Sequence, residues 1–337
     1  MIDIEDHEKL IKYLREKGII NHKDHIVVEM LEGGVSCKVM RASTPKTDIV
    51  IKQAREKLLV REDWFSDVTR ILIERDCLEA YNRIIPEIVP KLIFSDDDNY
   101  LYAMSAAPPQ AVMWKTELME GNIKRSMADA LGGAIAKVHS FSMGNKDIQS
   151  MFNKTKFFEE LRLNPYLETA RDRNPEVASE LTDVLKFLRE DRTALVHGDF
   201  SPKNILAWDD QMMLLDFEVA HIGNPAFDLG FMMTHFLLKA VVFPERREEF
   251  LALIESFLNA YFCSFSSEST AKVFGQTVAV LGGIVLARVD GKSPVEYIND
   301  DSTKQRIREI AYRLLRAEQI DKVDFKSFLK QTLKELA

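Results

Sequence analysis

The chain carries the sequence Val-His-Gly-Asp-Phe-Ser-Pro-Lys-Asn-Ile-Leu at residues 196–206 and Leu-Leu-Asp-Phe-Glu at residues 214–218. Between residues 194 and 217 the apolar residues come in short runs joined by polar turns, which predicts a β-hairpin within a largely helical region. Asp199, Asn204 and Asp216 each stand at the edge of one apolar run. Because strands anchored in a core hold their flanking side chains firmly, we expect the chemistry of the protein here.

These three side chains suit phosphoryl transfer. That reaction needs a carboxylate to orient the attacking hydroxyl and accept its proton, and oxygen ligands to hold Mg²⁺. Asp199 opens the loop and suits the first role, whereas Asn204 and Asp216 stand on the two arms of the hairpin and suit the second. The plain alternative is that all three are solvated polar groups of a surface hairpin.

The same residues carry a resemblance to a known family. His197-x-Asp199, with Asn204 five residues after the aspartate, resembles the catalytic loop of the protein-kinase-like superfamily. The forms His-Gly-Asp and Ser-Pro-Lys-Asn are similar to its aminoglycoside phosphotransferase and choline kinase branch, which includes methylthioribose and homoserine kinases. Asp216-Phe217-Glu218 stands where protein kinases carry Asp-Phe-Gly, and the segment Asn-Pro-Ala-Phe-Asp-Leu-Gly at 224–230 resembles the family's next segment.

The resemblance implies a role for each matching residue. Asp199 would be the catalytic base, Asn204 and Asp216 the Mg²⁺ ligands, and Asp228 a structural brace for the catalytic loop. His197 lies beside Gly198 and an apolar strand, so we expect a hydrogen-bonded structural histidine there and not a proton shuttle.

The first hundred or so residues predict a small, mostly antiparallel α+β lobe. A short helix at about 6–17 precedes strand-like runs at 25–31, 35–40 and 48–54. A helix follows to about residue 83, with Ser66 or Asp67 as its N-cap, and then two strands at 91–95 and 100–104. Three strands, a helix and two strands make a compact α+β unit.

Beyond the prolines at 108 and 109, helical periodicity dominates. Helices are expected at about 126–141, 175–190, 227–242, 246–265, 270–288 and 303–317. Together with the resemblance, this predicts an α+β fold of the bilobal protein-kinase-like type, with a small antiparallel-sheet N-lobe and a larger, mainly helical C-lobe. The expected domains are a nucleotide-binding lobe at 1–104, a hinge at 105–110, and a catalytic and substrate lobe at 111–337.

Lys52 lies in the very apolar third strand-like run, where an unpaired lysine would be costly to bury. We therefore expect it to face a phosphate or a carboxylate; the alternative is an edge-strand lysine that discourages aggregation. In the resembling family this lysine contacts the α- and β-phosphates and pairs with a helix glutamate. Glu74 shares its helix face with Ile71, Leu78 and Tyr81, whereas Glu79 lies on a polar face, so Glu74 is the predicted partner.

Two backbone segments complete the predicted nucleotide site. Gly33-Gly34 forms a hairpin turn between strands, and the backbone N–H groups of Val35 and Ser36 are candidates for covering the phosphates, although the full Gly-x-Gly-x-x-Gly pattern is missing. The stretch from Met104 resembles the family hinge, which implies that the backbone of Ser105 and Ala107 contacts the adenine edge.

The acceptor side is less defined by the sequence. A polar break at 287–297 has the stop signals of a helix C-terminus, and that plain interpretation competes with a functional one. In the functional interpretation Arg288, Asp290 or Glu296 line the acceptor pocket. An acidic wall of Asp290, Glu296 and Glu218 would suit a polyamine or amino-alcohol acceptor.

Composition limits the other classes of function. The 337 residues include 45 Lys and Arg against 53 Asp and Glu, a formal net charge of −8, which argues against a nucleic-acid partner. The three cysteines (Cys37, Cys77 and Cys263) do not form a disulfide or zinc pattern. The N-terminus is acidic, and the apolar run 277–287 is short for a membrane span. We expect a cytoplasmic protein without a membrane partner; the oligomeric state stays open.

The predicted function is an ATP- or GTP-dependent, Mg²⁺-dependent phosphotransferase that moves the γ-phosphate to a hydroxyl of a small molecule. The alternative is a non-catalytic nucleotide-binding regulator on the same fold. A protein kinase is less favoured, because only 11 residues separate Asp216 from Asp228, too few for an activation segment and peptide platform.

Overall fold

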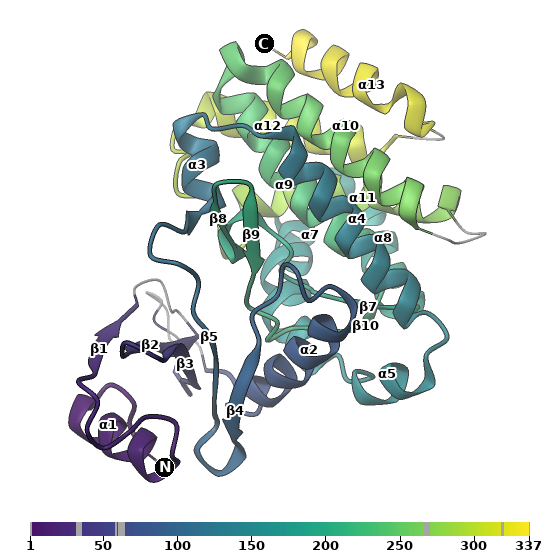
Figure 1. Ribbon diagram of the computed structural model, residues 1–337. Helices are drawn as coiled ribbons and strands as arrows, with labels where there is room; N and C mark the ends of the chain where they lie inside the picture. The colour runs from purple at the N-terminus through teal and green to yellow at the C-terminus, as the bar shows by residue number, and fades with distance from the viewer. Residues whose placement is uncertain are drawn as a thin grey trace. The chain divides into compact units, whose positions relative to one another are not determined.

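The computed structural model describes residues 2–31, 36–57, 59, 65–265, 270–317 and 320–336. The chain forms two compact units, which Figure 1 shows by residue colour. The small unit comprises Met1–Ala111 together with Met213–Glu218, and the large unit comprises Val112–Met212 and Val219–Ala337. A short segment from the second half of the chain is therefore built into the first unit. Each unit is described by itself below.

The small unit is built on a five-stranded antiparallel sheet. Its spatial order is β1 (Val27–Met30), β2 (Cys37–Ser43), β3 (Asp48–Ala54), β5 (Leu101–Ser105) and β4 (Leu92–Asp96). Lys52 on β3 pairs with Val39 on one side and Tyr102 on the other. The edge-strand interpretation of Lys52 is therefore wrong, because β3 is the central strand of the sheet.

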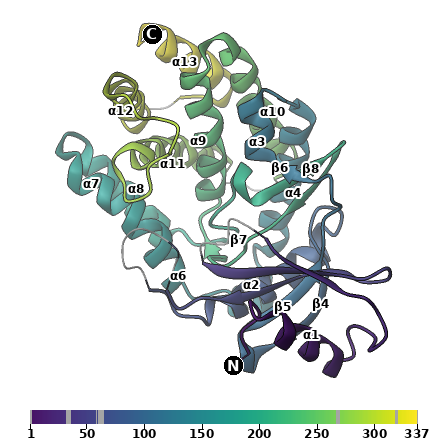
Figure 2. The ribbon, with the colours of Figure 1, turned by 90° about the vertical axis from the view of Figure 1, so that its left-hand side faces the viewer.

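Helices cover the sheet of the small unit (Figure 2). Leu10 and Leu14 of α1 (His7–Glu16) share one apolar cluster with Ile49 and Ile51 of β3. Because side chains alternate along a strand, Lys52 belongs to the other face, where α2 (Arg70–Ile84) contacts β3, β4 and β5.

The helix α2 begins later than its predicted N-caps. Its N-cap is Thr69, not Ser66 or Asp67. The Asp67 carboxylate instead accepts hydrogen bonds from the backbone N–H and the hydroxyl of Thr69, at 3.0 and 2.9 Å. A short Asx-type turn therefore precedes the helix and competes with it for the first residues.

The large unit is mainly helical. The helices α4 (Arg125–Ser142), α9 (Ala226–Val242), α10 (Arg247–Ser264) and α11 (Thr270–Asp290) pack against one another, as Figure 1 shows. Around them lie α3 (Trp114–Glu120), α5 (Lys146–Met151), α6 (Lys156–Phe158), the π-helix Glu159–Glu168, α7 (Thr169–Arg173), α8 (Ala178–Glu190), α12 (Asp301–Leu315) and α13 (Lys322–Glu335). The helix α9 is buried almost throughout, so its polar residues need an explanation from packing or function.

The helix α11 is longer than the apolar run that marks it in the sequence. By length and composition alone it could cross a membrane, but 67% of its most apolar window is buried inside the structure. That burial is typical of the core helix of a globular unit. All three cysteines are free, Cys37 and Cys77 being buried and Cys263 exposed.

The segment 194–223 consists of short strands, as expected. They do not form a single hairpin but belong to two small sheets. β7 (Ala194–Val196) pairs with β10 (His221–Gly223), while β8 (Ile205–Trp208) lies between β6 (Val112–Met113) and β9 (Gln211–Leu214). The catalytic loop 197–204 thus leaves one small sheet and enters another, and both ends are fixed by backbone pairing.

Candidate active site

The small unit places a buried lysine between two carboxylates. The Lys52 Nζ contacts Glu74 Oε1 and lies 3.2 Å from Asp216 Oδ1. The predicted Lys52–Glu74 pair is therefore present, and the Asp216 side chain joins it from the segment 213–218. Glu74 is fully buried and the Lys52 side chain is only 9% exposed, whereas Asp216 keeps 24% exposure.

The electrostatics of this group favour a charged lysine. Burial opposes the charge on Lys52, but Glu74, Tyr102 and Asp216 outweigh burial and raise the pKa of Lys52 well above its ordinary value. Burial also raises the pKa of Glu74, against the opposing effect of Lys52. Lys52 therefore stays an ammonium at neutral pH, with Asp216 as its more exposed neighbour.

A buried arginine holds the segment that carries Asp216. The Arg70 Nε lies 3.0 Å from Glu218 Oε2, and its Nη1 donates to the carbonyls of Ser66 and Asp67 at 3.1 and 3.0 Å. Its Nη2 contacts the carbonyl of Ser36 and lies 2.7 Å from that of Arg55. One guanidinium thus joins the start of α2, the ends of β2 and β3, and Glu218.

Of the two backbone N–H groups predicted to cover the phosphates, the structure describes only that of Ser36. Val35 lies outside the described residues, together with Gly33 and Gly34. Ser36 is described, and its carbonyl accepts from the Arg55 N–H at 3.0 Å.

In the hinge stretch the Ser105 N–H is already occupied, because it donates to the carbonyl of Lys91 at 2.9 Å. The Ala107 carbonyl receives a long bond, 3.4 Å, from Arg41. Within the described part of the chain the Ala107 N–H shows no partner, which leaves it as the better donor for a base edge.

In the large unit, Asp199 is buried and asymmetrically bound. Its Oδ2 accepts from Arg162 Nη2 at 2.8 Å, Lys203 Nζ at 2.9 Å and Asn204 Nδ2 at 2.7 Å. Its Oδ1 is buried and has no hydrogen-bond partner among the described residues. Burial acts to raise the pKa of Asp199, but Arg162 and Lys203 outweigh it and hold the pKa well below its ordinary value. The group is therefore a carboxylate at neutral pH with one oxygen left to accept a hydrogen bond.

A second buried aspartate shapes the loop around Asp199. The Asp228 carboxylate accepts from the backbone N–H of His197 at 2.7 Å and of Gly198 at 2.9 Å, and lies 3.2 Å from His139 Nε2. His197 Nδ1 in turn accepts from the Asp199 N–H at 3.2 Å. Asp228 and His197 thus occupy the positions expected of structural supports.

Gly198 is required by the backbone. Its φ is +76°, and a Cβ there would lie 2.9 Å from the carbonyl oxygen of Val219. A side chain would be strained both by the left-handed conformation and by this contact with backbone.

Two oxygen-bearing side chains, one in each unit, are of the type that binds a hard cation. Asn204 turns its Nδ2 toward the carbonyl and the Oδ2 of Asp199, at 2.8 and 2.7 Å, so its Oδ1 remains to act as a ligand. Asp216 has φ of 72°, an unusual conformation for a residue other than glycine that points to a fixed orientation. Among the described residues no three His, Cys, Asp or Glu side chains form a metal cluster. A carboxylate and an amide oxygen suit Mg²⁺, which takes few protein ligands and completes its shell with phosphate oxygens and water.

Comparison with known proteins identifies the family. The model of the phosphotransferase enzyme family matches residues 28–263, which is most of the chain. The chain belongs to the phosphotransferase enzyme family. This confirms the family predicted from the motifs at 197–204 and 216–230.

Curated relatives of this phosphotransferase include methylthioribose kinases. One from Geobacillus sp. (strain WCH70) is 26% identical over 230 residues, which are 60% of this chain and 57% of the relative. Another from Bacillus cereus is 23% identical over 269 residues, 71% of this chain and 66% of the relative. The chain therefore spans less than two thirds of the length of these relatives.

Solved structures support the fold of the phosphotransferase. A choline/ethanolamine kinase family protein from Mesorhizobium loti superposes with a TM-score of 0.58 at 14% identity, covering 98% of both chains. An amicoumacin kinase in complex with AMP-PNP, Ca²⁺ and amicoumacin gives 0.57 at 13% identity, covering 95% of this chain and 97% of that one. The predicted α+β, protein-kinase-like fold class is confirmed.

The three carboxylates predicted to line an acceptor pocket are engaged with cationic neighbours. Asp290 forms a bidentate pair with Arg308 at 2.7 and 2.8 Å, and Glu296 contacts Lys115. Glu218 pairs with Arg70 in the small unit, as described above. Each carboxylate of the expected acidic wall thus has its own cation.

Two functional cations escaped the sequence analysis. Arg162 lies 37 residues before Asp199, on the π-helix Glu159–Glu168, and no spacing rule connects the two. Arg70 could have been found, because it lies four residues before Glu74 on the same apolar face of α2.

Proposed function

We propose that this protein is an ATP- or GTP-dependent and Mg²⁺-dependent kinase that transfers the γ-phosphate to a hydroxyl of a small molecule. The observation that carries the proposal is the asymmetry of Asp199. Three donors occupy Oδ2, while no donor of the part of the chain that the structure describes reaches the buried Oδ1. A substrate hydroxyl is the donor that would complete this site.

Asp199 acts mainly by orientation. Because Arg162 and Lys203 hold the pKa of Asp199 low, its carboxylate is a weak base. It accepts the proton only when the hydroxyl oxygen bonds to phosphorus and the hydroxyl becomes more acidic. That timing suits phosphoryl transfer, where the transition state is loose and positioning contributes most of the rate. His197 and Asp228 fix the loop and do not touch the reacting atoms.

The small unit supplies the nucleotide contacts in this proposal. Lys52, held by Glu74, neutralises charge on the α- and β-phosphates, and the backbone at Val35 and Ser36 covers them. The Ala107 N–H and the Ser105 carbonyl face the base of the nucleotide. In this arrangement residues 1–104 form the nucleotide-binding lobe, 105–110 the hinge and 111–337 the catalytic and substrate lobe.

Asn204 and Asp216 are the proposed metal ligands. Mg²⁺ bound by them would shield the charge of the phosphate oxygens. The Lys52 ammonium 3.2 Å from Asp216 orients that carboxylate before the nucleotide arrives. The free cysteines are consistent with a cytoplasmic location, and the net charge of −8 favours a small-molecule partner over a nucleic acid.

A transfer assay tests this proposal. The protein is incubated with γ-labelled ATP or GTP, Mg²⁺ and methylthioribose, choline, ethanolamine or an aminoglycoside, and labelled product is measured. We expect label on a small hydroxyl compound, and loss of Mg²⁺-dependent nucleotide binding in Asp216→Ala. Nucleotide binding without transfer to any compound would favour the regulator, and label on protein would favour a protein kinase.

A further inference from the structure

The large unit contains a buried and half-buried group of basic side chains that the loop 197–204 does not use. His235 and Lys239 lie on one face of α9, four residues apart, and Arg288 lies near the end of α11. Lys239 has no exposed surface and His235 only 7%. Tyr297 lies beyond α11, with its ring centroid 5.6 Å from Lys239 Nζ. This set of four residues is called the α9 cluster below.

Within the described residues Lys239 has an aromatic neighbour, Tyr297, but no carboxylate partner. Its only hydrogen bond is a long one, 3.4 Å, to the carbonyl of His235, and no carboxylate of the described residues forms an ion pair with it. Burial and the nearby Lys115 lower the pKa of Lys239 to about 7, against the weaker opposing effect of Glu296. At that pKa about half of the Lys239 side chains are protonated at neutral pH, and an anion bound beside Nζ would favour the ammonium form.

Arg288 is equally unneutralised. Its Nη1 donates to Tyr166 Oη at 3.1 Å and to the carbonyl of Ser293 at 2.5 Å, both uncharged acceptors. Its Nε and the hydroxyl of Tyr297 are buried and find no hydrogen-bond partner within the described ranges. Three donors of the α9 cluster therefore have unused capacity: Lys239 Nζ, Arg288 Nε and Tyr297 Oη.

The α9 cluster is continuous with Asp199. Tyr166 lies about one turn after Arg162, which contacts Asp199 at 2.8 Å. The ring of Tyr166 packs on Phe231 with centroids 5.9 Å apart, and Phe231 in turn lies 5.7 Å from His235. The residues between Asp199 and the α9 cluster therefore form one chain of contacts. Tyr166 contacts Arg288 directly and reaches His235 of α9 through Phe231.

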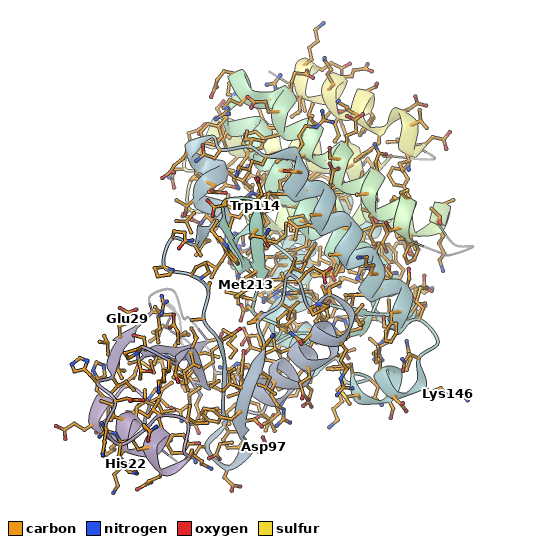
Figure 3. All side chains as sticks on the ribbon, in the orientation of Figure 1. His22, Glu29, Asp97, Trp114, Lys146 and Met213 are labelled. Atoms are coloured by element: carbon orange, nitrogen blue, oxygen red, sulfur yellow. The ribbon has the colours of Figure 1, made fainter. Side chains whose placement is uncertain are left out.

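The charge balance of this region is positive. Lys115 and Glu296 neutralise each other; Lys115 follows Trp114, which Figure 3 labels at the start of α3. Asp290 is taken by Arg308. Among the described residues Lys239 and Arg288 form no ion pair with a carboxylate, so the α9 cluster suits an anionic group better than the cationic acceptors that an acidic wall would have attracted.

We propose that the acceptor of this phosphotransferase carries an anionic group, a carboxylate or a phosphoryl group, which Lys239 and Arg288 bind while a hydroxyl of the same molecule reaches Asp199. The inference rests on the proposed function, because it names the class of its acceptor. The acceptor is then a hydroxy acid or a phosphorylated polyol rather than an amino alcohol or polyamine.

Thermal unfolding of the full chain with matched probes tests the proposal. The probes are D-glycerate against glycerol, ribose 5-phosphate against ribose, and choline as the cation. We expect glycerate or ribose 5-phosphate to raise the melting temperature by about 2 °C or more, whereas the neutral probes and choline do not. The two anionic arms distinguish a carboxylate from a phosphoryl group.

The variant Lys239→Met tests whether the rise in melting temperature depends on the α9 cluster. We expect the variant to lose the anion-dependent shift and, without ligand, to melt at or above the temperature of the wild type, because an unpaired buried charge is gone. Lys272→Met, on an exposed lysine of α11, should keep the shift. A merely structural lysine would instead lower the melting temperature when replaced.

Three results would overturn the proposal: stabilisation by choline and not by the anions, no Lys239-dependent shift with either anion, or a ligand-free Lys239→Met that melts well below the wild type. The proposed kinase function is tested separately with AMP-PNP and Mg²⁺. These should stabilise the wild type and Lys239→Met alike, and failure there would remove the kinase function without altering the anion result.

Discussion

Lys52 Nζ lies 3.2 Å from Asp216 Oδ1 although 164 positions separate the two residues. The small unit thus contains both the cation proposed for the phosphates and one carboxylate proposed for the metal. Glu74 holds the lysine from α2, and Arg70 holds the segment of Asp216 through Glu218. The fixed geometry of these groups within one compact unit supports a preorganised nucleotide site.

Removing Lys52 separates its structural role from its functional one. Lys52→Met leaves Glu74 buried without a counter-charge, and we expect the free energy of unfolding to fall by about 3–5 kcal/mol. The double variant Lys52→Met/Glu74→Leu should recover most of this stability, because both buried charges are gone. It should still fail to bind AMP-PNP in calorimetry, and wild-type affinity in the double variant would contradict the role of Lys52.

Because Glu218 pairs with Arg70, its replacement should lower the stability of the protein without changing the binding of the acceptor. Glu218→Gln weakens a charged hydrogen bond to a fully buried guanidinium, so we expect the unfolding free energy to drop by about 1–3 kcal/mol. The KM for the acceptor should stay unchanged. Arg83→Met, on an exposed position of α2, should shift stability by less than about 0.5 kcal/mol. A large KM change in Glu218→Gln with normal stability would return Glu218 to the acceptor site.

The pKa of Asp199 predicts the pH dependence of the reaction. Because the pKa lies well below its ordinary value, Asp199 is a carboxylate throughout the neutral range and should impose no acid limb on kcat/KM above about pH 5. Arg162→Met removes one of the two cations that hold the pKa of Asp199 down, while the burial that raises it remains, so the pKa of Asp199 should rise. An acid limb should then appear in this variant.

Arg171→Met is the control for that pH profile, since Arg171 pairs locally with Asp172. Its profile should match the wild type. Identical profiles in all three proteins would show that Arg162 does not keep Asp199 ionised. The same linkage acts on stability: the contribution of ionised Asp199 is present above the ordinary aspartate pKa and lost as the pH falls through the lowered one.

Gly198 provides a test of backbone geometry with a matched control. Gly198→Ala forces a side chain into a left-handed conformation with its Cβ 2.9 Å from the Val219 carbonyl, and we expect a loss of about 1–3 kcal/mol. Gly275→Ala, in an open position of α11, should stabilise by about 0.5–1 kcal/mol. Chemical denaturation measures both, and a neutral Gly198→Ala would show that the loop tolerates other conformations.

The sequence contained enough information for the elements that local patterns encode. Strand β3 occupies the expected residues, and the Lys52–Glu74 pair follows from one rule, that a charge on an apolar face needs a partner. The family motifs led to the phosphotransferase family because their spacing is specific. The helix α13 was missed, although Phe325 and Leu329 carry its apolar face at helical spacing.

Other features depend on contacts that local sequence does not encode. Arg162 reaches Asp199 only because the π-helix packs beside the catalytic loop. The neighbouring strands β8 and β9 agree with the predicted hairpin, whereas the pairing of β7 with β10 joins residues about 25 positions apart and was not predicted. Glu218 looked available from its motif, but its partner Arg70 lies 148 positions away. Long-range ion pairs of this kind decide which acids are free to bind a ligand.

Single-turnover transfer by Asp199→Asn tests the central claim most directly. With γ-labelled ATP, Mg²⁺ and an acceptor that the wild type phosphorylates, we expect the transfer rate to fall by about 10³-fold or more, while AMP-PNP affinity changes less than about threefold. Asp210→Asn, at an exposed acid of the neighbouring turn, should transfer at the wild-type rate. Transfer by Asp199→Asn at a rate close to that of the wild type would contradict the assignment of Asp199 to the acceptor hydroxyl.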